Sequence, residues 1–326
     1  MKYREFSNVG WKVSEIGIGC WAIGSEWGDV SPENAKDALF TSLDNGVNFF
    51  DTADVYGDGR SEKFIGEILK NTKEKIYVAT KAGRRLDPHV SEGYNLNNIE
   101  AFIDRSLLNL GIDTIDLLQL HCPPSDICGK SETYEMMDEI VKKGKIKYYG
   151  VSVEKVSEAL DAIKFPNVKS IQIIFNIFRQ KPNEIFFKEA KKNNVAIIVR
   201  VPLASGLLTG KMNLNSSFPK NDHRNYNING DSFDVGETFS GINFHKGIEA
   251  VKELKTLLPQ DFSLTDLALK WILSHDEVTV VIPGAKNKLQ AQLNTRASEM
   301  NNINTIMNSI SDIYQSYFKD DVHSRW

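Results

Sequence analysis

Residues 97–121 read NNIEAFIDRSLLNLGIDTIDLLQLH, a helical segment followed directly by an apolar run. The pattern predicts a helix that begins near Asn97, where Asn97 and Glu100 resemble a capping box. Gly111 is expected to end this helix in a left-handed conformation. The run TIDLLQL at 114–120 is continuously apolar apart from single polar residues, which is typical of a strand buried on both faces of a parallel sheet. The stretch therefore predicts a helix-then-strand unit of an α/β protein.

The same alternation of apolar runs and helical segments extends along the chain. Ser31 and Pro32 are expected to be the N-cap and the first residue of a helix that Gly46 ends. Further helices are expected to open at Ser61 and Ser131. The apolar runs are EIGIG (15–19), VNFFD (47–51), IYVAT (76–80), TIDLLQL (114–120), IKYYGV (146–151), SIQIIF (170–175), VAIIVR (195–200) and VTVVIP (278–283).

Eight strand-helix units predict a closed (β/α)₈ barrel of the TIM type, with an open doubly wound sheet as the alternative. Before the first unit, YREF and WKVS flank the turn-prone SNVG and predict an N-terminal β-hairpin at the surface. The length of 326 residues suggests two domains by the usual size, but α/β barrels reach this length as one. Because no linker rich in Gly, Ser or Pro divides the chain, we expect residues 1–326 to form a single domain. The polar stretch at roughly 211–245 has little periodicity and is expected to be a long loop after the seventh strand.

Composition and charge exclude several classes of protein. The chain has 39 Lys and Arg against 43 Asp and Glu, a net charge of −4, so it lacks the positive excess of a nucleic-acid-binding protein. No apolar stretch approaches the roughly 18 residues of a membrane helix, and the N-terminus does not resemble a signal peptide. Three cysteines, Cys20, Cys122 and Cys128, are too few and too widely spaced for a disulfide scaffold or a metal site. We therefore expect a cytoplasmic protein without membrane, nucleic-acid or metal binding.

Four ionisable residues stand at the predicted ends of consecutive strands, where a barrel carries its chemistry. Asp51 and Tyr56 follow the second run, Lys81 the third and His121 the fourth. This set suits reduction of a carbonyl, since a proton donor must neutralise the charge that develops on oxygen. A lysine beside the phenol is expected to lower the tyrosine pKa, and a carboxylate is expected to hold that lysine. Each residue alone has an ordinary structural explanation, but together they favour catalysis.

Several motifs in succession resemble the aldo-keto reductase family. The run GVNFFDTADVYG at 46–57, continuing to Ser61, Glu62 and Gly66, is similar to the family signature. Further segments match in order: ATKAG (79–83), SLLNLGIDTIDLLQLH (106–121), KKGKIKYYGVSV (142–153), PLASGLLTGK (202–211) and VVIPGAKNKLQAQLN (280–294). The resemblance extends from about residue 3 to 300 and points to the bacterial-type branch with a long loop after strand seven.

This resemblance implies a (β/α)₈ barrel that binds a nicotinamide cofactor, NADP(H) rather than NAD(H), in an extended form. By position it implies Tyr56 as the proton donor, Lys81 and Asp51 as its tuning pair, and His121 as the group that orients the substrate. Nicotinamide contacts are implied for Gly19, Cys20, Trp21, Asp51, Ser152 and Gln172. Pyrophosphate contacts are implied for Leu203, Ser205, Gly206 and Lys211. Contacts to the adenosine half are implied for Gly284, Lys286, Gln290 and Asn294, with Lys286 available to a 2′-phosphate.

Arg200 departs from the family pattern. It stands at the end of strand seven, where the family has an aromatic residue that stacks on the nicotinamide. Its planar guanidinium has two open roles, stacking on the cofactor in place of that ring or pairing with a carboxylate or phosphate of the ligand. Arg200 is therefore included among the expected cofactor-binding residues.

The sequence thus predicts an NADP(H)-dependent oxidoreductase that reduces an aldehyde, ketone or sugar-like carbonyl of a small molecule. A nicotinamide-binding regulatory subunit is an alternative from another class, because the family includes potassium-channel β subunits. A barrel enzyme with non-redox chemistry is a third. Substrate specificity is expected from the loops after the strands, including 24–30 and 212–244, and from the tail ending in Trp326; Trp21 and Trp27 are candidates for an apolar pocket wall.

Overall fold

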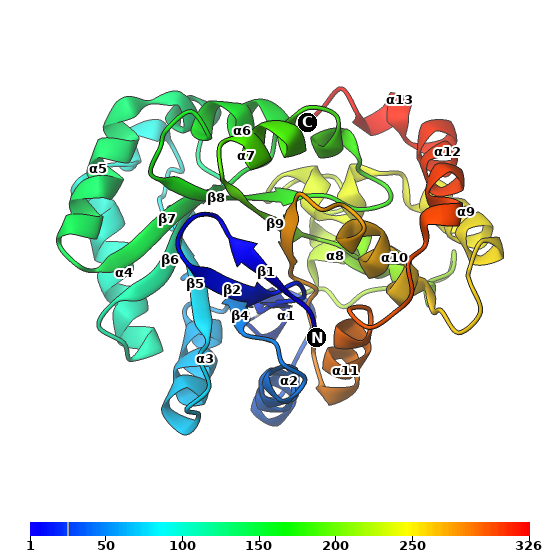
Figure 1. The fold of residues 1–326 in the computed structure, drawn as a ribbon, viewed down its shortest axis with the longest axis horizontal. Coiled ribbons are helices and arrows are strands. Elements are labelled where there is room, and N and C mark those ends of the chain that lie inside the picture. Colours follow the sequence, from blue (N-terminus) through cyan, green and yellow to red (C-terminus); the bar gives the residue numbers. More distant parts are fainter. Residues whose placement is uncertain (25) are drawn as a thin grey trace.

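An eight-stranded parallel sheet forms the centre of the fold in the computed structural model, which describes residues 1–24 and 26–326 (Figure 1). Ser25, in the loop 24–30 that was expected to contribute to specificity, lies outside the described residues. Sheet order follows the sequence, and each neighbouring pair of strands is parallel. The strands are β3 (Ile18–Gly19), β4 (Phe49–Asp51), β5 (Tyr77–Ala82), β6 (Ile115–His121), β7 (Ile146–Ser152), β8 (Val168–Ile174), β9 (Ala196–Arg200) and β10 (Val278–Val281).

Backbone hydrogen bonds join the first and last strands and bring the sheet round into a barrel. The amide of Gly17 donates to the carbonyl of Val281 at 2.8 Å, and that of Gly19 donates to Pro283 at 3.0 Å. A Cβ atom on Gly19 would lie 2.7 Å from the carbonyl oxygen of Ile282, so closure requires glycine there. The predicted (β/α)₈ barrel is confirmed, and the open doubly wound alternative is wrong.

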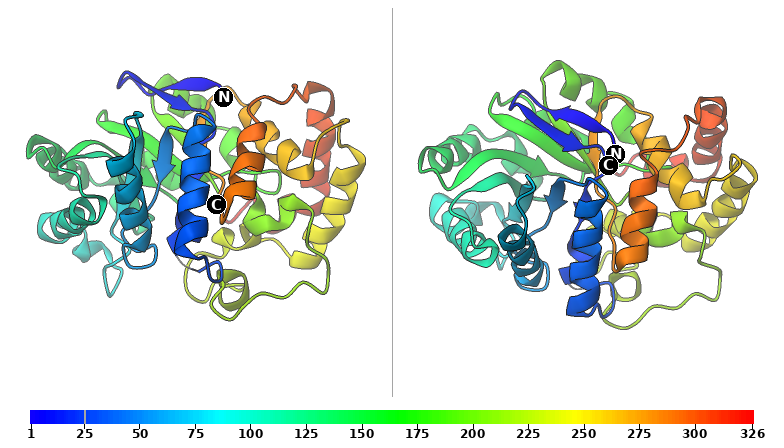
Figure 2. Two further views of the ribbon diagram at one scale, coloured as in Figure 1. Left: turned by 90° about the horizontal axis from the view of Figure 1, so that it is seen from below. Right: turned by 60° about the horizontal axis from the view of Figure 1, so that its bottom comes forward.

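Helices follow the strands and cover the outside of the barrel. The first long helix begins at Pro32 with Ser31 as its N-cap, as predicted, and packs against the helix after the last strand (Figure 2). Among the described residues, none of the helices combines the length and hydropathy needed to cross a lipid bilayer. The helices are α1 (Trp21–Gly24), α2 (Pro32–Asp44), α3 (Arg60–Asn71), α4 (Leu96–Leu110), α5 (Ser131–Lys142), α6 (Val156–Ala162), α7 (Phe186–Lys192), α8 (His223–Tyr226), α9 (Phe244–Thr256), α10 (Leu264–Leu273), α11 (Lys288–Arg296), α12 (Met307–Tyr317) and α13 (Lys319–Val322).

The cap of α4 differs from the prediction. Asn95, in an extended conformation, accepts a hydrogen bond from the amide of Asn98 at 3.2 Å and is the N-cap. Asn97 and Glu100, expected to form a capping box, lie inside the helix instead. Both asparagines can cap, and the backbone turns into the helix at the earlier one. Gly111 ends the helix with φ +66°, as predicted.

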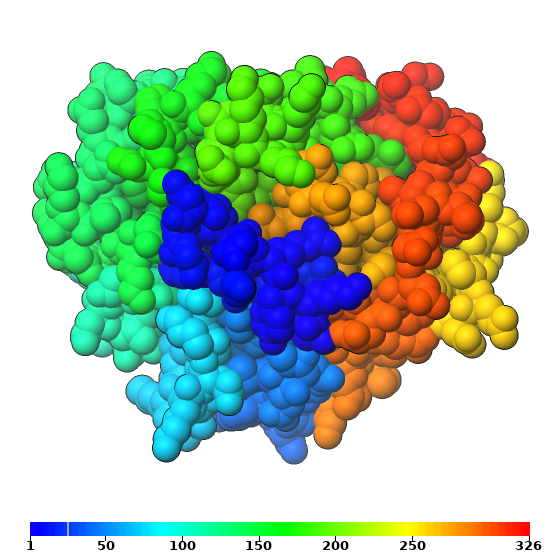
Figure 3. All heavy atoms as spheres, viewed as in Figure 1, coloured from blue at the N-terminus to red at the C-terminus, as the bar shows by residue number. Residues whose placement is uncertain are grey.

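The N-terminal hairpin, β1 (Tyr3–Phe6) and β2 (Trp11–Ser14), closes one end of the barrel. Phe6 is fully buried, and its ring stacks on Phe49 with centroids 5.6 Å apart. Trp11 stacks on Tyr77 at the start of β5. The predicted surface hairpin therefore has one buried face, and it covers the middle of the barrel end seen in Figure 3.

The polar segment 211–245 contains short helical turns, although the sequence predicted a loop with little periodicity. Besides α8, it holds η5 (Val235–Glu237) and η6 (Phe239–Gly241). It lies on the side of the strands away from the hairpin (Figure 2). The other 3₁₀ turns are η1 (Ser91–Gly93), η2 (Ser125–Gly129), η3 (Lys181–Asn183), η4 (Ala204–Thr209) and η7 (Asn304–Ile306).

Candidate active site

The expected catalytic residues meet at the carboxyl ends of β4, β5 and β6. The ammonium group of Lys81 lies 2.5 Å from Oδ1 of Asp51 and donates to the backbone carbonyl of Thr52 at 2.8 Å. Its third contact is the hydroxyl oxygen of Tyr56 at 3.3 Å. Lys81 and Asp51 are almost wholly buried. A buried ion pair thus holds a cation against the phenol, the arrangement that proton donation to an alkoxide requires.

The second oxygen of Asp51 is bound from across the barrel. Gln172 on β8 donates to Oδ2 at 2.7 Å, and Gln119 on β6 donates to the same oxygen at 3.0 Å. The Gln172 amide also donates to Oε1 of Gln119 at 3.1 Å. These bonds satisfy the carboxylate of the buried pair, which makes its burial tolerable. Gln119 was missed, although a glutamine inside the apolar run TIDLLQL was a usable signal.

Burial of the Tyr56 hydroxyl raises its pKa well above the usual value, and the charges of Asp51 and Glu237 raise it further. Arg84 and Arg200 act in the opposite direction without overcoming this effect. The net shift of the Tyr56 pKa is thus opposite in direction to the lowering expected from Lys81, because burial outweighs the nearby positive charges. Tyr56 keeps its proton at neutral pH, as a donor must.

The imidazole of His121 is neutral at pH 7. Burial lowers its pKa well below the usual value, and the positive charges of Arg84, Lys81 and Arg200 add to this. Its Nδ1 is buried, and none of the described residues is a hydrogen-bond partner for it. Because a buried, unpaired N–H is rarer than an unpaired acceptor, the proton is assigned to Nε2. His121 lines the cavity described next, where an Nε2–H can donate to a carbonyl oxygen.

A cavity of about 450 Å³, within the range of about 300–1,000 Å³ of small-molecule sites, opens at these strand ends. Cys20, Lys81 and Ser152 do not line it: Lys81 lies beneath Tyr56, and the Ser152 hydroxyl lies 3.7 Å from the thiol of Cys122. The expected residues that do line it are Gly19, Trp21, Asp51, Tyr56, His121, Gln172, Arg200, Leu203, Ser205, Gly206, Lys211, Gly284, Lys286, Gln290 and Asn294.

The cavity suits a phosphate-bearing cofactor. Lys211 and Lys286 bring positive charge to its wall, while its carboxylates, Asp51 and Glu237, are already paired with cations. Arg224 and Arg296 also line it, and they pair with Asp222 at 2.6 Å and Asp266 at 3.8 Å. The ammonium group of Lys286 donates to the backbone carbonyl of Trp27, and burial lowers its pKa. A phosphate in contact with such a partly desolvated lysine would restore its preferred charged state. Arg224 and Arg296 were not predicted from the sequence to line the cavity.

Aromatic rings form one wall of the cavity. Trp21 and Trp27 meet edge to face with ring centroids 5.4 Å apart, and His223 packs against both, at 4.7 and 4.5 Å. Trp21 also lies parallel to the ring of Tyr56 at 6.0 Å. Both tryptophans line the cavity. They therefore present apolar surface beside Tyr56.

Arg200 belongs to a group of four charged side chains, called here the charged cluster: Arg84, Glu154, Arg200 and Glu237. One guanidinium nitrogen of Arg200 lies 2.9 Å from Glu154, and the other lies 3.5 Å from Glu237. Arg84 contacts the same two carboxylates at 3.2 and 2.5 Å. Arg200 is therefore paired with carboxylates of the protein itself. Arg84, Glu154 and Glu237 were missed, since no local motif contains them.

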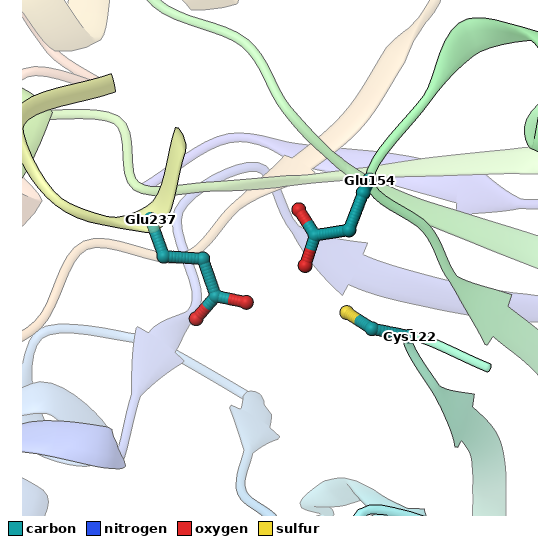
Figure 4. Close-up of side chains that lie close together, drawn as sticks. All are labelled: Cys122, Glu154 and Glu237. Atoms are coloured by element: carbon teal, nitrogen blue, oxygen red, sulfur yellow. The ribbon is translucent and has the colours of Figure 1, made fainter. Parts of the chain in front are cut away.

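The carboxyl groups of Glu154 and Glu237 also converge on the thiol of Cys122, each from a different segment (Figure 4). One ligand atom from each lies within 4.8 Å of the others, a spacing compatible with a metal ion. Both carboxylates, however, already accept hydrogen bonds from Arg84, and Arg200 also approaches them. A divalent cation would lie beside two guanidinium groups, so the charge distribution opposes a metal site.

Comparison with known proteins gives the same family throughout. The family model described as "Aldo/keto reductase family" matches residues 15–314. The uncharacterized oxidoreductase YqkF of Bacillus subtilis is 30% identical over 99% of this chain and 98% of its own. The aldo-keto reductase yakc [NADP(+)] of Schizosaccharomyces pombe is 30% identical over 84% of this chain and 80% of its own.

Solved structures agree. The holo form of aldo-keto reductase AKR11C1 from Bacillus halodurans has a TM-score of 0.77 and 28% identity over 98% of this chain and 99% of its own. More distant relatives include an NADH-specific methylglyoxal reductase of Escherichia coli, 26% identical over 89% of this chain and 91% of its own. A probable voltage-gated potassium channel subunit beta of Arabidopsis thaliana is 28% identical over 97% of each chain. This chain belongs to the aldo/keto reductase family.

Proposed function

We propose that this protein uses NADP(H) to reduce an aldehyde, ketone or sugar-like carbonyl to an alcohol, with Tyr56 as the proton donor. The observation that carries the proposal is the position of the Lys81 ammonium group, which lies between Oδ1 of Asp51 at 2.5 Å and the hydroxyl of Tyr56 at 3.3 Å. The family membership supports carbonyl reduction in general. The three cysteines are free thiols, which supports a reducing cytoplasm as the location.

In this mechanism the residues hold the carbonyl and supply a proton. When bound, a reduced nicotinamide supplies the hydride that adds to the carbonyl carbon. His121 donates a hydrogen bond to the carbonyl oxygen and fixes its direction. Tyr56 transfers its proton to the oxygen as negative charge develops there, and Lys81 stabilises the resulting tyrosinate. Asp51 pairs with Lys81 and holds it in place, and Trp21 and Trp27 exclude water from one side.

Replacement of the proton donor tests the reaction. Tyr56→Phe should lower kcat for an aldehyde by about a hundredfold or more while NADPH still binds. Tyr148→Phe is the matched control, since Tyr148 packs edge-on against Trp11 at the hairpin end of the barrel. Equal turnover by Tyr56→Phe and the unaltered protein would refute Tyr56 as the donor.

The choice of NADP(H) over NAD(H) rests on Lys286, whose partly buried ammonium group lines the cavity at the start of α11. The relatives include proteins named for NADP(+) and for NADH. Lys286→Met should weaken NADPH binding by about tenfold and leave NADH binding nearly unchanged. Lys288→Met, on the exposed side of the same helix, is the control. Equal dissociation constants for NADPH and NADH in the unaltered protein would contradict this choice.

A second candidate is a nicotinamide-binding regulatory subunit with little turnover. The specific observation that favours it is the similarity to plant proteins named as probable potassium channel β subunits. Tight NADPH binding without turnover of any tested aldehyde or ketone, together with co-purification of a partner protein, would support it over the reductase.

A further inference from the structure

The charged cluster lies where a substrate would contact it. Arg200 and Glu237 line the same cavity as Tyr56 and His121. The cluster's charges also act on both of these groups, since Arg84 and Arg200 influence the pKa of each. The four side chains of the cluster are only 6–20% exposed, so water screens their charges weakly. The sign of the cluster's net charge is therefore felt in the substrate pocket.

That net charge depends on Glu237. Arg84 and Arg200 carry two positive charges, and Glu237 contacts both guanidinium groups. Burial opposes ionisation of Glu237, but Arg84 and Arg200 outweigh it and hold its pKa below the usual range. Glu237 is thus the carboxylate that stays ionised in the cluster. Without it, two arginines would face Glu154 alone.

Glu237 comes from the long loop, and the indole of Trp326 holds that part of the loop. A Cβ atom on Gly236 would lie 3.1 Å from the Trp326 ring, and one on Gly241 would lie 2.3 Å from it, so the ring fills a slot between these glycines. The indole N–H donates to the carboxylate of Asp234 at 3.2 Å. Trp326 therefore contacts the residues on both sides of Glu237.

Arg179 stacks on the Trp326 ring. Its guanidinium lies 3.9 Å from the ring centroid and donates to the backbone carbonyl of Glu154 at 2.6 Å. One stack of side chains therefore connects the two acidic residues of the cluster. The indole is 5% exposed, so its burial contributes to holding this stack together.

We propose that Glu237 determines substrate selectivity: held by Trp326 and acting together with Glu154, it offsets the charges of Arg84 and Arg200 so that the pocket prefers uncharged carbonyl compounds to those that carry a carboxylate. This inference rests on the proposed carbonyl reduction and names its substrate class. Glu237 is a specificity-determining residue, and Trp326 is a positioning residue. Loss of the Glu237 charge should make the cluster more positive and the pocket more favourable to anions.

The experiment compares two aldehydes of the same shape, para-nitrobenzaldehyde and para-carboxybenzaldehyde, which differ in charge. In the unaltered protein, kcat/KM should be higher for the nitro compound. Glu237→Gln keeps the size of the side chain and removes its charge, and should shift the ratio toward the carboxylate by about tenfold or more. Glu100→Gln, which removes a carboxylate paired with Lys143 and Lys145 and absent from the cavity wall, should leave the ratio unchanged. An unchanged ratio in Glu237→Gln would overturn the proposal.

A binding measurement separates this inference from the proposed function. Calorimetric titration of benzoate and of benzamide, which have the same shape, into the protein saturated with NADP+ needs no turnover. Glu237→Gln should bind benzoate about tenfold more tightly than the unaltered protein does, with benzamide unchanged. Absence of turnover with this binding shift would refute the reductase and support the charge assignment. Turnover without the shift would support the reductase and overturn the role of Glu237.

Trp326→Phe tests whether Trp326 positions Glu237. It removes the N–H bond to Asp234 and part of the ring in the glycine slot, and should move the aldehyde ratio in the same direction as Glu237→Gln, by a smaller factor. A lower melting temperature with an unchanged ratio would show that Trp326 acts only in stability and would overturn its positioning role.

Discussion

The side-chain amide of Gln172 donates a hydrogen bond of 2.7 Å to Oδ2 of Asp51 from the opposite side of the barrel. β8 stands four places from β4 in the sheet order, so this bond crosses the barrel interior. Asp51 is therefore fixed by Lys81, Gln119 and Gln172 together. A carboxylate held from three directions keeps one orientation without help from a ligand.

Gln172→Leu should lower the free energy of unfolding by about 1–3 kcal/mol, because it removes a donor from a buried carboxylate. Urea denaturation at neutral pH measures this loss. Gln292→Leu, at an exposed position on α11, should change the free energy little. Equal losses in the two variants would contradict the structural importance of the cross-barrel bond.

Lys81→Met should lower the free energy of unfolding by about 3–5 kcal/mol, since it leaves Asp51 buried without its cation. The double variant Asp51→Asn/Lys81→Met should recover much of this stability, because no charge remains unpaired. It should not recover carbonyl reduction, which needs the lysine beside Tyr56. Thermal unfolding of the unaltered protein, Lys81→Met and the double variant checks the stabilities, and steady-state kinetics of the same three proteins check the activities. Recovery of activity in the double variant would limit the pair to a structural role.

The pH dependence of kcat/KM for an uncharged aldehyde should show no inflection from His121. Burial holds its pKa well below the usual value, so the imidazole is neutral around neutral pH. Loss of activity is expected only at high pH, where Tyr56 loses its proton. An inflection near pH 6.5 that disappears in His121→Gln would contradict a neutral imidazole.

Asp54 should make the protein less stable as the pH rises from about 4 to 7. Both of its carboxyl oxygens are buried. Burial and then the charge of Glu62 raise its pKa from 3.8 to about 7, against the effects of Arg85, Arg105 and a backbone hydrogen bond from Val55. The folded protein therefore holds a proton that the unfolded chain releases in this window, and stability falls as that proton is lost.

Asp54→Asn keeps the shape of the side chain and removes the ionisation. At pH 8 it should be more stable than the unaltered protein, by roughly 1–4 kcal/mol at about 1.4 kcal/mol per pKa unit. Below about pH 4 the difference should vanish. Urea denaturation across this pH range checks both limits, and parallel pH curves for the two proteins would show that Asp54 does not titrate in the window.

Glu154 should make substrate selectivity depend on pH. Burial raises its pKa to about 7, so it is protonated below that pH and ionised above it. Below about pH 7 the charged cluster keeps one negative and two positive charges, and kcat/KM for para-carboxybenzaldehyde should rise relative to the nitro compound. Glu154→Gln should fix the ratio at its low-pH value. The charged and titratable groups that face Glu154 are Arg84, Cys122, Arg179, Arg200 and Glu237.

The barrel and the meeting of the expected catalytic residues at one end of it were predictable because both are encoded locally. Each apolar run has its own helix after it, and Asp51 and Tyr56 stand five residues apart in one motif at a strand end. Parallel strands then bring Lys81 and His121 to the same end. The (β/α)₈ prediction is confirmed, while the roles of the individual residues remain predictions.

The charged cluster was not predictable, because its members come from separate segments. Arg84 follows β5, Glu154 follows β7, Arg200 ends β9, and Glu237 belongs to a loop with no periodic pattern. Arg200 alone was expected at the site, as a cofactor-binding residue. Arg84, Glu154 and Glu237 stand in no motif that the sequence prediction used, and only folding brings them to Arg200 and removes them from water. The contacts of Trp326 could not be predicted for the same reason, because its partners Gly236 and Gly241 are distant in the chain.

The hairpin β1–β2 limits the route by which reactants can enter and leave the barrel. Phe6 and Trp11 fill the end of the barrel opposite the cavity, so that end offers no passage through the rings packed there. Reactants and products must then share the mouth at the strand ends. Whichever molecule lies deeper has to enter first and leave last, so the order of binding is set by depth in the pocket.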